Sequence, residues 1–421
     1  MTSRALAVLE SGAEDLYYND INNSKVQALP VEYNTRFTYD FSNKTQGTSV
    51  FLLPPGNGYR VPVIVIGWNA STLAGNTGLY ALPRGWGYSA VARISFRVAG
   101  STQFYWSGLQ LLQRNLRMVR TSTQADQILS LGGNAVATSS DWSRDQFAYI
   151  PLTCWSGPSV DGISLPLPGD ILSQNVQISV ELNPPSSYFI TNSNPGAATG
   201  SIPSAFDVAY LQAEQLVLSD KAQSLANDAD FAEGRVSYSM PVLFDQQEVV
   251  ISNLNATTAS QPVVLSGFRS GEVKSIECFL VDRTANTNLN WKKPTEVSVI
   301  YAGVIYSQYN NGVSALFNLI DGTKGSVVNT VQLSAPASPG TMSATNITAE
   351  WVSLPFGQRS GADYSDDVHS HGKEILNGIV NLQISLPDAG TSGGSSKYDL
   401  HIIYTYVSLI NFSRGTAEWV F

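Results

Sequence analysis

The side chains best suited to chemistry in this chain are three aspartates and two histidines near its C-terminal end. They are Asp363, Asp366, Asp367, His369 and His371. Carboxylate oxygens and imidazole nitrogens bind divalent transition metals, and two histidines separated by one residue can approach the same ion. The segment is bordered by Gly and Ser, however, and no third histidine follows closely. We therefore interpret it as a solvated loop and predict no metal site.

The other candidate side chains favour packing. His401 lies within an aromatic strand sequence, so we expect a packed or edge-strand histidine. Trp86, Trp106 and Trp155 could form a platform for a sugar ring, but large aromatic side chains more commonly fill cores and subunit interfaces. We predict core or interface packing for these three.

Motifs for catalysis and cofactor binding are absent from the sequence. There is no Gly-x-Ser-x-Gly and no Gly-x-x-x-x-Gly-Lys-Ser/Thr loop. Cys154 and Cys278 are too few for a disulfide framework or a zinc site, and we expect two buried thiols. The sequence therefore predicts no catalytic residue, no cofactor and no enzymatic activity.

Composition indicates an all-β protein of two domains. The 421 residues exceed one ordinary core, and only 14% of them are charged whereas 10% are aromatic. The net charge of −9 and the lack of basic runs argue against direct nucleic-acid binding. Six Asn-x-Ser/Thr triplets are consistent with chance in a chain rich in these residues. They begin at Asn22, Asn43, Asn69, Asn255, Asn346 and Asn411.

Residues 1–24 are predicted to be an N-terminal arm. Leu6, Leu9 and Leu16 fall on one side of a short helix, and the segment is polar afterwards. The apolar run is too short for a secretory signal, and no stretch reaches the roughly 20 apolar residues that span a bilayer.

Strand signals begin at Val31, where Tyr33, Phe37 and Phe41 alternate with polar residues. Leu109–Leu116 is the most helix-like stretch of the first half. The other predicted strands are Arg60–Ile66, Ser89–Val98, Phe147–Leu152, Val176–Leu182, Phe206–Leu218, Val236–Met240, Gln247–Ser252, Val273–Val281, Glu296–Tyr306, Ile375–Leu386 and Tyr398–Tyr406.

One composition shift marks the joint between the domains. Ser219–Glu233 is rich in Ala and Asp, begins with a helix-capping residue and ends before Gly234. We therefore predict a first domain over 25–218, a linker over 219–235 and a second domain over 236–421.

The two domains repeat one plan, because three anchors recur in the same order. Trp86 and Trp291 each precede a β run that ends in Ala-Gly. Ile-Leu-x-x-x-Val-x-Ile/Leu occurs from Ile171 and again from Ile375, and an aromatic-Asp-apolar triplet opens a late strand in each half. A duplicated unit of about 190 residues with long Gly/Pro/Ser loops predicts two tandem eight-stranded jelly rolls, in which two sheets each bury one face.

The second half resembles the double jelly-roll major capsid proteins of double-stranded DNA viruses, particularly those of nucleocytoplasmic large DNA viruses and their smaller relatives. Leu165-Pro-Leu167 precedes a late strand of the first roll, Ser353-Leu-Pro-Phe356 precedes the His-containing loop, and Gly378-Ile-Val-Asn381 follows it. Tyr404-Thr-Tyr406 and Ser413-Arg-Gly415 close the chain. The Pro-Ser-Gly expected before the small-residue strand is replaced by Gly372–Asn377.

This resemblance implies a structural protein of the virion, assembled in the cytoplasm or nucleus of a host cell. Homotrimers of pseudo-hexagonal outline would tile an icosahedral capsid beside neighbouring capsomers and minor capsid or penton proteins. The loops Gly67–Trp86, Asn183–Pro203 and Gly325–Thr341 would form towers or contacts between subunits, and the N-terminal arm would reach a neighbour or an internal membrane.

A second hypothesis is a carbohydrate-binding or carbohydrate-processing tandem β-sandwich. It predicts a concave face that presents tryptophan together with paired carboxylates.

Overall fold

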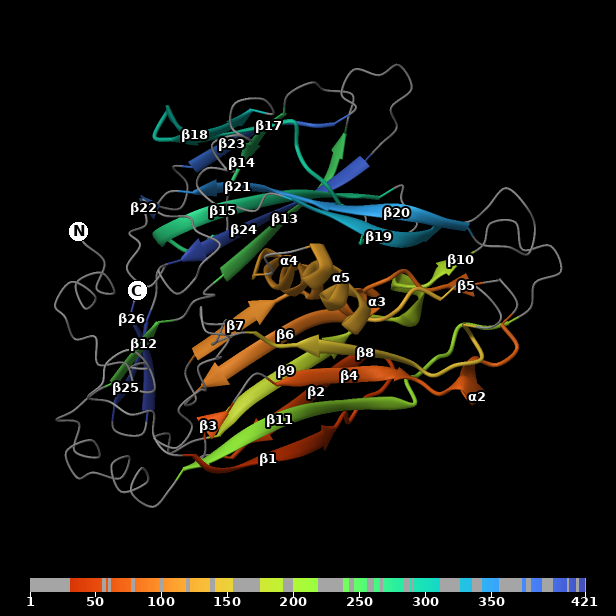
Figure 1. The fold of residues 1–421 in the computed structure, drawn as a ribbon. Helices are drawn as coiled ribbons and strands as arrows, with labels where there is room; N and C mark the ends of the chain where they lie inside the picture. The colour runs from red at the N-terminus through yellow and green to blue at the C-terminus, as the bar shows by residue number, and fades with distance from the viewer. Residues whose placement is uncertain are drawn as a thin grey trace.

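The computed structural model describes residues 31–54, 58–59, 62–76, 80–98, 102–118, 122–136, 141–153, 175–191, 200–218, 238–241, 246–255, 261–265, 268–283, 288–289, 291–310, 326–334, 343–355, 373–375, 380–387, 397–406, 409–413 and 416–420. The predicted arm (1–24), the predicted linker (219–235) and the segment 363–371 lie outside these ranges. Strands dominate, with a few short helices (Figure 1). No helix within these ranges is long and apolar enough to cross a membrane.

The first half forms two main antiparallel sheets, one of five strands and one of four. One sheet has the order β1 (Val31–Asp40), β11 (Val208–Leu218), β4 (Val63–Trp68) and β8 (Gln146–Pro151), with β3 (Gly58–Tyr59) also paired to β11. The other has the order β2 (Gly47–Leu53), β9 (Val176–Leu182), β6 (Val91–Val98) and β7 (Thr102–Trp106). Burial alternates along β2, β8 and β9 because successive side chains of a strand point to opposite faces. The predicted strands Phe147–Leu152 and Val176–Leu182 are confirmed by β8 and β9, whereas β2 was not predicted.

The second half forms two main sheets of the same kind. One has the order β13 (Gln246–Asn255), β24 (Lys397–Tyr406), β15 (Gly271–Asp282) and β21 (Val352–Pro355). The other has the order β14 (Gln261–Val264), β23 (Val380–Ser385), β17 (Glu296–Tyr301) and β18 (Val304–Asn310).

Smaller strands extend this framework. In the second half, β22 (Lys373–Ile375) pairs with β15, and a further extension runs through β16 (Trp291–Lys292), β20 (Ser343–Glu350) and β19 (Ser326–Ser334). A separate sheet contains β12 (Tyr238–Pro241), β25 (Leu409–Ser413) and β26 (Thr416–Val420). In the first half, β5 (Tyr80–Ala81) pairs with β10 (Ile190–Thr191).

The two halves share one topology. When the eight main strands of either half are numbered along the chain, one sheet has the order 1-8-3-6 and the other the order 2-7-4-5. These are the two sheets of a jelly roll, whose sequence-distant strands become neighbours. The predicted anchors fall on equivalent strands: Val176 and Val380 open β9 and β23, and the aromatic-Asp-apolar triplets lie at the starts of β11 and β24. The duplication is therefore confirmed.

Several predicted segments differ from the structure. The predicted strand Ser89–Val98 begins only at Val91, because Ser89 and Ala90 belong to a short helix, and in the predicted strand Ile375–Leu386 the residue Ile375 ends β22 whereas β23 begins at Val380. Glu296–Tyr306 was predicted as one strand but forms the hairpin β17–β18, because Ala302 (φ 50°) and Gly303 (φ 83°) make a two-residue turn in the left-handed region. The hairpin β6–β7 occupies the equivalent place in the first half. Gly325–Thr341 was predicted as a loop but contains β19, which pairs with β20.

Helices occupy connections within the first half. They are α2 (Ala70–Leu73), α3 (Trp86–Ala90), α4 (Gly108–Met118), α5 (Ser122–Leu131) and the 3₁₀ turn η2 (Pro185–Ser187). The predicted helix Leu109–Leu116 is confirmed by α4. The predicted loop Gly67–Trp86 therefore contains α2 and β5, and Asn183–Pro203 contains η2 and β10. In Figure 1, α4 and α5 lie between the first roll and the strands β13, β15 and β24 of the second.

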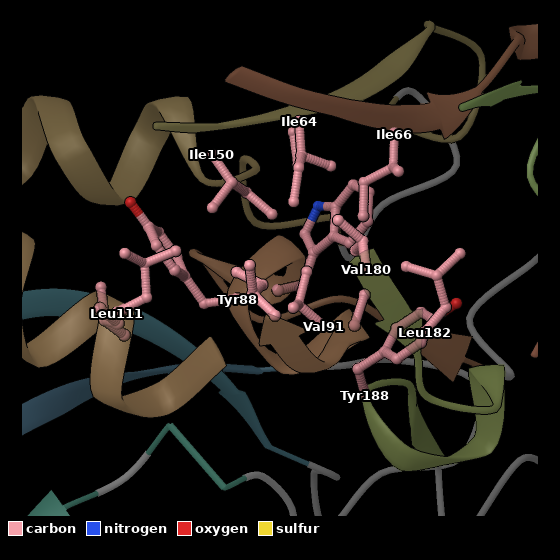
Figure 2. Packing of buried hydrophobic residues seen from close by; sticks show 14 of the residues in the cluster. Ile64, Ile66, Tyr88, Val91, Leu111, Ile150, Val180, Leu182 and Tyr188 are labelled. Carbon is pink, nitrogen blue, oxygen red and sulfur yellow. The ribbon is translucent and has the colours of Figure 1, made fainter. Parts of the chain in front are cut away.

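The core of the first half is apolar and aromatic. Ile64 and Ile66 of β4 pack in one cluster with Val91 of β6 and Val180 of β9 (Figure 2). Burying a side chain of this size stabilises the fold by about 1.5–3 kcal/mol. Trp68 adds ring contacts to Trp86, 5.1 Å between centroids, and its indole N–H donates to the carbonyl of Ala205 over 2.7 Å.

Candidate functional site: the contact between the two halves

The side chains that the sequence offered for metal binding do not form a site within the described residues. Asp363, Asp366, Asp367, His369 and His371 lie outside it, so the solvated loop stays a prediction. Among the residues that the structure describes, no three His, Cys, Asp or Glu side chains come together as metal ligands.

His401 is packed within the second half, as expected. It lies on β24, and its Nδ1 is 2.6 Å from Oε1 of Glu248 on the neighbouring strand β13. Its ring stacks on Phe279 of β15 with 4.8 Å between centroids and an interplanar angle of 7°. The imidazole is thus held by one carboxylate and one aromatic face, which orients it without exposing it.

The sugar-platform hypothesis is wrong for two of its three tryptophans. Trp86 and Trp106 expose 0% and 2% of their surface and belong to the core of the first half. A sugar ring stacks on an exposed aromatic face, which neither residue offers. Trp155 lies outside the described residues.

Cys278 is a buried thiol, as predicted. It lies on β15 with its side chain in the core of the second half, and it forms no disulfide. Burial raises the pKa of this thiol to about 12, because the apolar core disfavours the thiolate. Cys154 lies outside the described residues.

A buried charge pair joins the two halves. Glu277 of β15 is fully buried and accepts hydrogen bonds from Nε2 of Gln113, over 2.6 Å, and from the guanidinium of Arg117. Gln113 and Arg117 are one helical turn apart on α4, so both point to the same carboxylate. Ser275 on β15 accepts from Arg117 over 3.4 Å. Burying a carboxylate is costly unless it is paired in this way.

A second set of polar contacts continues along the same helix face. Nε2 of Gln110 on α4 lies 3.4 Å from Oε1 of Gln246 on β13, and Gln246 donates to Thr405 of β24 over 3.1 Å. Farther along the interface, Ser89 donates to Oδ1 of Asn288 over 2.6 Å. The helix α4 is therefore hydrogen-bonded directly to β15 and β13, and to β24 through Gln246, and these bonds fix the orientation of the two halves.

The opposite side of α4 is tied to the first half. Arg114 is fully buried, and its guanidinium donates to the hydroxyl of Thr153 and lies 5.0 Å from the ring of Trp106. Thr153 in turn donates to Oδ1 of Asn115 over 2.7 Å. Because both sides of the helix are anchored, α4 acts as a rigid spacer between the halves.

Apolar packing completes the contact. Phe279, Trp291 and Ile403 come from the second half, yet they belong to the hydrophobic cluster of the first. The rings of Phe279 and Trp291 stack with 4.3 Å between centroids. The central strands β24 and β15 are thus buried on both faces, which explains the nearly continuous burial along β24, whereas the edge strand β13 is partly exposed.

These interface residues were missed by the sequence reasoning. Glu277 is one of several charged residues of β15, and α4 carries glutamine and arginine at several positions, so both sequences resemble those of surface elements. The available signal was the continuous apolar run 278–281 within β15, because a strand with one solvated face alternates between polar and apolar residues.

The first roll also has an open polar groove on the outer face of β2-β9-β6-β7. The guanidinium carbon of Arg93 lies 3.8 Å from the ring centre of Tyr105, beside Arg97 and Glu181. The groove therefore presents side chains of both charges to solvent.

Comparisons with known proteins agree with the topology. No protein-family model and no curated protein matches the sequence. The chain is similar in structure to the capsid of the virus PBCV-1, with 11% identity and a TM-score of 0.60 over 94% of this chain and 98% of that one. It is similar to the Faustovirus major capsid protein, with 11% identity and a TM-score of 0.56 over 93% and 92%. The Sputnik virophage structure matches with 12% identity and a TM-score of 0.53 over 95% and 91%.

The fold is a double jelly roll. The resemblance noted in the second half therefore extends over nearly the whole chain. Within this double jelly roll, α4 is the element between strands five and six of the first roll that holds the second roll in place.

Proposed function

We propose that this protein is a structural capsid protein whose homotrimers tile an icosahedral virion shell. The observation that carries the proposal is the presence of two rolls of identical strand order that are fixed to each other by a buried contact. Two similar rolls per chain present six similar units per trimer, and six units give a pseudo-hexagonal outline. The solved structures with this fold include major capsid proteins, which supports the same role here.

Such a protein functions through the surfaces by which its copies contact one another and other capsid proteins. We propose no catalytic residue and no cofactor, and no direct contact with nucleic acid, since the net charge is −9. The partners would be neighbouring capsomers and minor capsid or penton proteins, met through the loops between strands. Residues 25–218 and 236–421 would be the two rolls, with 219–235 as their joint.

Native mass and electron microscopy test this proposal together. Light scattering on a sizing column should give a trimer near 136 kDa, three times the chain mass of 45.4 kDa. Negative-stain images of the same fraction should show a hexagonal outline. A monomer at every concentration tested would contradict the proposal.

The N-terminal arm offers a separate test. We propose that residues 1–20 reach a neighbouring capsomer or an internal membrane. Their deletion should impair shell assembly and leave the melting temperature of the rolls unchanged. Assembly at the wild-type rate would refute this role of the arm.

A further inference from the structure

The turn between β17 and β18 is exposed and apolar. Val304 exposes 68% of its surface and Ile305 exposes 57%, and Ala302 and Gly303 before them are also exposed. A Cβ added at Gly303 would meet no atom within 4 Å other than those of its chain neighbours, so the turn projects away from the roll. The turn of an exposed hairpin is normally formed by polar residues and glycine. We call residues 302–305 the apolar tip.

The sequence around the apolar tip carries no charge. Residues 297–320 contain no Asp, Glu, Lys, Arg or His, and Tyr301 and Tyr306 flank the tip directly. Tyrosine is enriched where apolar chain meets lipid headgroups, because its ring is apolar and its hydroxyl group is polar. The rim that surrounds a protein–protein contact is instead polar. An uncharged tip between two tyrosines therefore matches the chemistry of a lipid surface.

The apolar surface continues beside the tip, on the solvent side of the sheet β14-β23-β17-β18. Ile305 pairs with Ile300 of β17, and Asn381 of β23 lies between Ile300 and Val264 of β14. Val264 exposes 70% of its surface. Side chains in register on adjacent strands lie on the same face of a sheet. The tip is thus the end of an uncharged surface rather than two isolated side chains.

The fold does not require apolar residues at this place. The hairpin β6–β7 is equivalent to β17–β18, and Ala-Gly lies between the strands of both hairpins. Ser101, Thr102 and Gln103 follow this pair in the first roll, whereas Val304 and Ile305 follow it in the second. A cluster of exposed apolar side chains that packing does not explain indicates a binding surface.

The apolar tip lies at the end of the molecule where the chain enters β1. In Figure 1, the turn of β17–β18 and the start of β1 both lie toward the left of the view. Residues 1–24 precede this strand and carry Leu6, Leu9 and Leu16. The arm is thus joined to the chain at the same end as the tip.

We propose that the apolar tip inserts into the surface of a lipid bilayer that lies against this end of the molecule. Val304 and Ile305 drive binding by leaving water, because the affinity of such a contact scales with the apolar area that it buries. Charge contributes little, since residues 297–320 are uncharged and the chain carries a net charge of −9. One chain carries a complete tip, so the inference does not depend on the proposed trimer, which would add avidity by presenting three tips.

Flotation of the full-length protein with phosphatidylcholine vesicles in a density gradient tests the proposal. The wild-type protein should float with the vesicles to the same extent at low and high salt, because apolar binding is not screened. Val304→Asp should lower the vesicle partition coefficient by about tenfold or more, since burying a side chain of this size is worth about that factor.

Val50→Asp is the matched control, because Val50 exposes 54% of its surface on the first roll, away from the tip. This variant should float as the wild-type protein does. Both variants should keep the wild-type near-ultraviolet circular dichroism, since both side chains lie largely in water.

A photo-cross-linker identifies what the tip touches. Ile305→p-benzoyl-phenylalanine should attach to lipid when the vesicle-bound protein is irradiated. Attachment to a second copy of the chain would overturn the inference and identify the tip as a protein contact. A wild-type protein that does not float, or a Val304→Asp variant that floats as well as the wild type, would also overturn it. Neither result changes the native mass, which tests the proposed function separately.

Discussion

Removal of the cation that pairs with Glu277 should strongly destabilise the protein. Glu277 is fully buried and Arg117 exposes 4% of its surface, so Arg117→Met leaves a carboxylate in the interface without its guanidinium. Removing one partner of a buried pair costs about 3–5 kcal/mol. For a unit of about 200 residues, this loss lowers the melting temperature by about 6–20 °C.

A double-mutant cycle separates the pair from its surroundings. Glu277→Gln alone should also destabilise the protein, because it leaves the Arg117 guanidinium buried without a counter-charge. The combined variant Arg117→Met/Glu277→Gln removes both charges and keeps an acceptor for Gln113. It should lose less free energy of unfolding than the sum of the two single variants, by about 2 kcal/mol or more.

Urea unfolding at one fixed protein concentration, followed by tryptophan fluorescence, measures these changes. The control is Asp126→Asn, which removes a pair between Arg84 and an aspartate whose side chain is 46% exposed. That variant should lose no more than about 1 kcal/mol. The loss in Arg117→Met should persist at high salt, because a buried pair is screened little. Additive losses in the cycle, or a loss in Arg117→Met no larger than in the control, would refute the reasoning.

Three further outcomes follow from the packing. Burial raises the pKa of Cys278 to about 12, so its thiol should resist alkylation at pH 8 in the folded protein and react in urea. Mass spectrometry of the peptide that contains Cys278 measures the extent of alkylation. Alkylation of the folded protein at the rate of the unfolded protein would contradict the burial of this thiol. Gly67→Ala should lower the melting temperature, because the added Cβ would lie 2.1 Å from the carbonyl oxygen of Gln146. Gly271→Ala is the control and should change the melting temperature little, because its Cβ would lie 3.4 Å from the nearest atom, in the ring of Tyr406. Ala302→Gly should raise the melting temperature slightly, because Ala302 has a φ of 50° and the left-handed region costs a non-glycine residue about 1 kcal/mol; a fall would argue against a strained turn.

Local patterns predicted most of the framework. Alternation in Val176–Leu182 identified β9 with both of its bounds, and the spacing in Leu109–Leu116 identified α4. Both signals are local, because side chains repeat every two residues in a strand and every 3.6 in a helix. The duplication was also visible, since equivalent strands keep similar residues at similar spacing.

Turns and short pairings were predicted less well. Ala302-Gly303 is a weaker hairpin signal than Asn-Gly or Asp-Gly, so β17 and β18 were merged into one strand. Strand β19, which pairs with β20, was missed although Val327, Val331 and Leu333 occupy alternate positions of its sequence. The sugar-platform hypothesis failed for Trp86 and Trp106 because residue type does not reveal burial.

The sequence by itself determined the all-β class, the two-fold repetition and the absence of catalytic motifs, because these depend on composition, period and spacing along the chain. Only the tertiary structure decided which strands are buried on both faces of their sheet. Arg117 and Glu277 are far apart in the sequence and meet only when α4 lies across β15. The aromatic side chains of Phe147, Tyr149 and Tyr210 likewise come together only when β8, β4 and β11 are aligned in register. A strand shows which residues share a side, and only the packed molecule shows what that side touches.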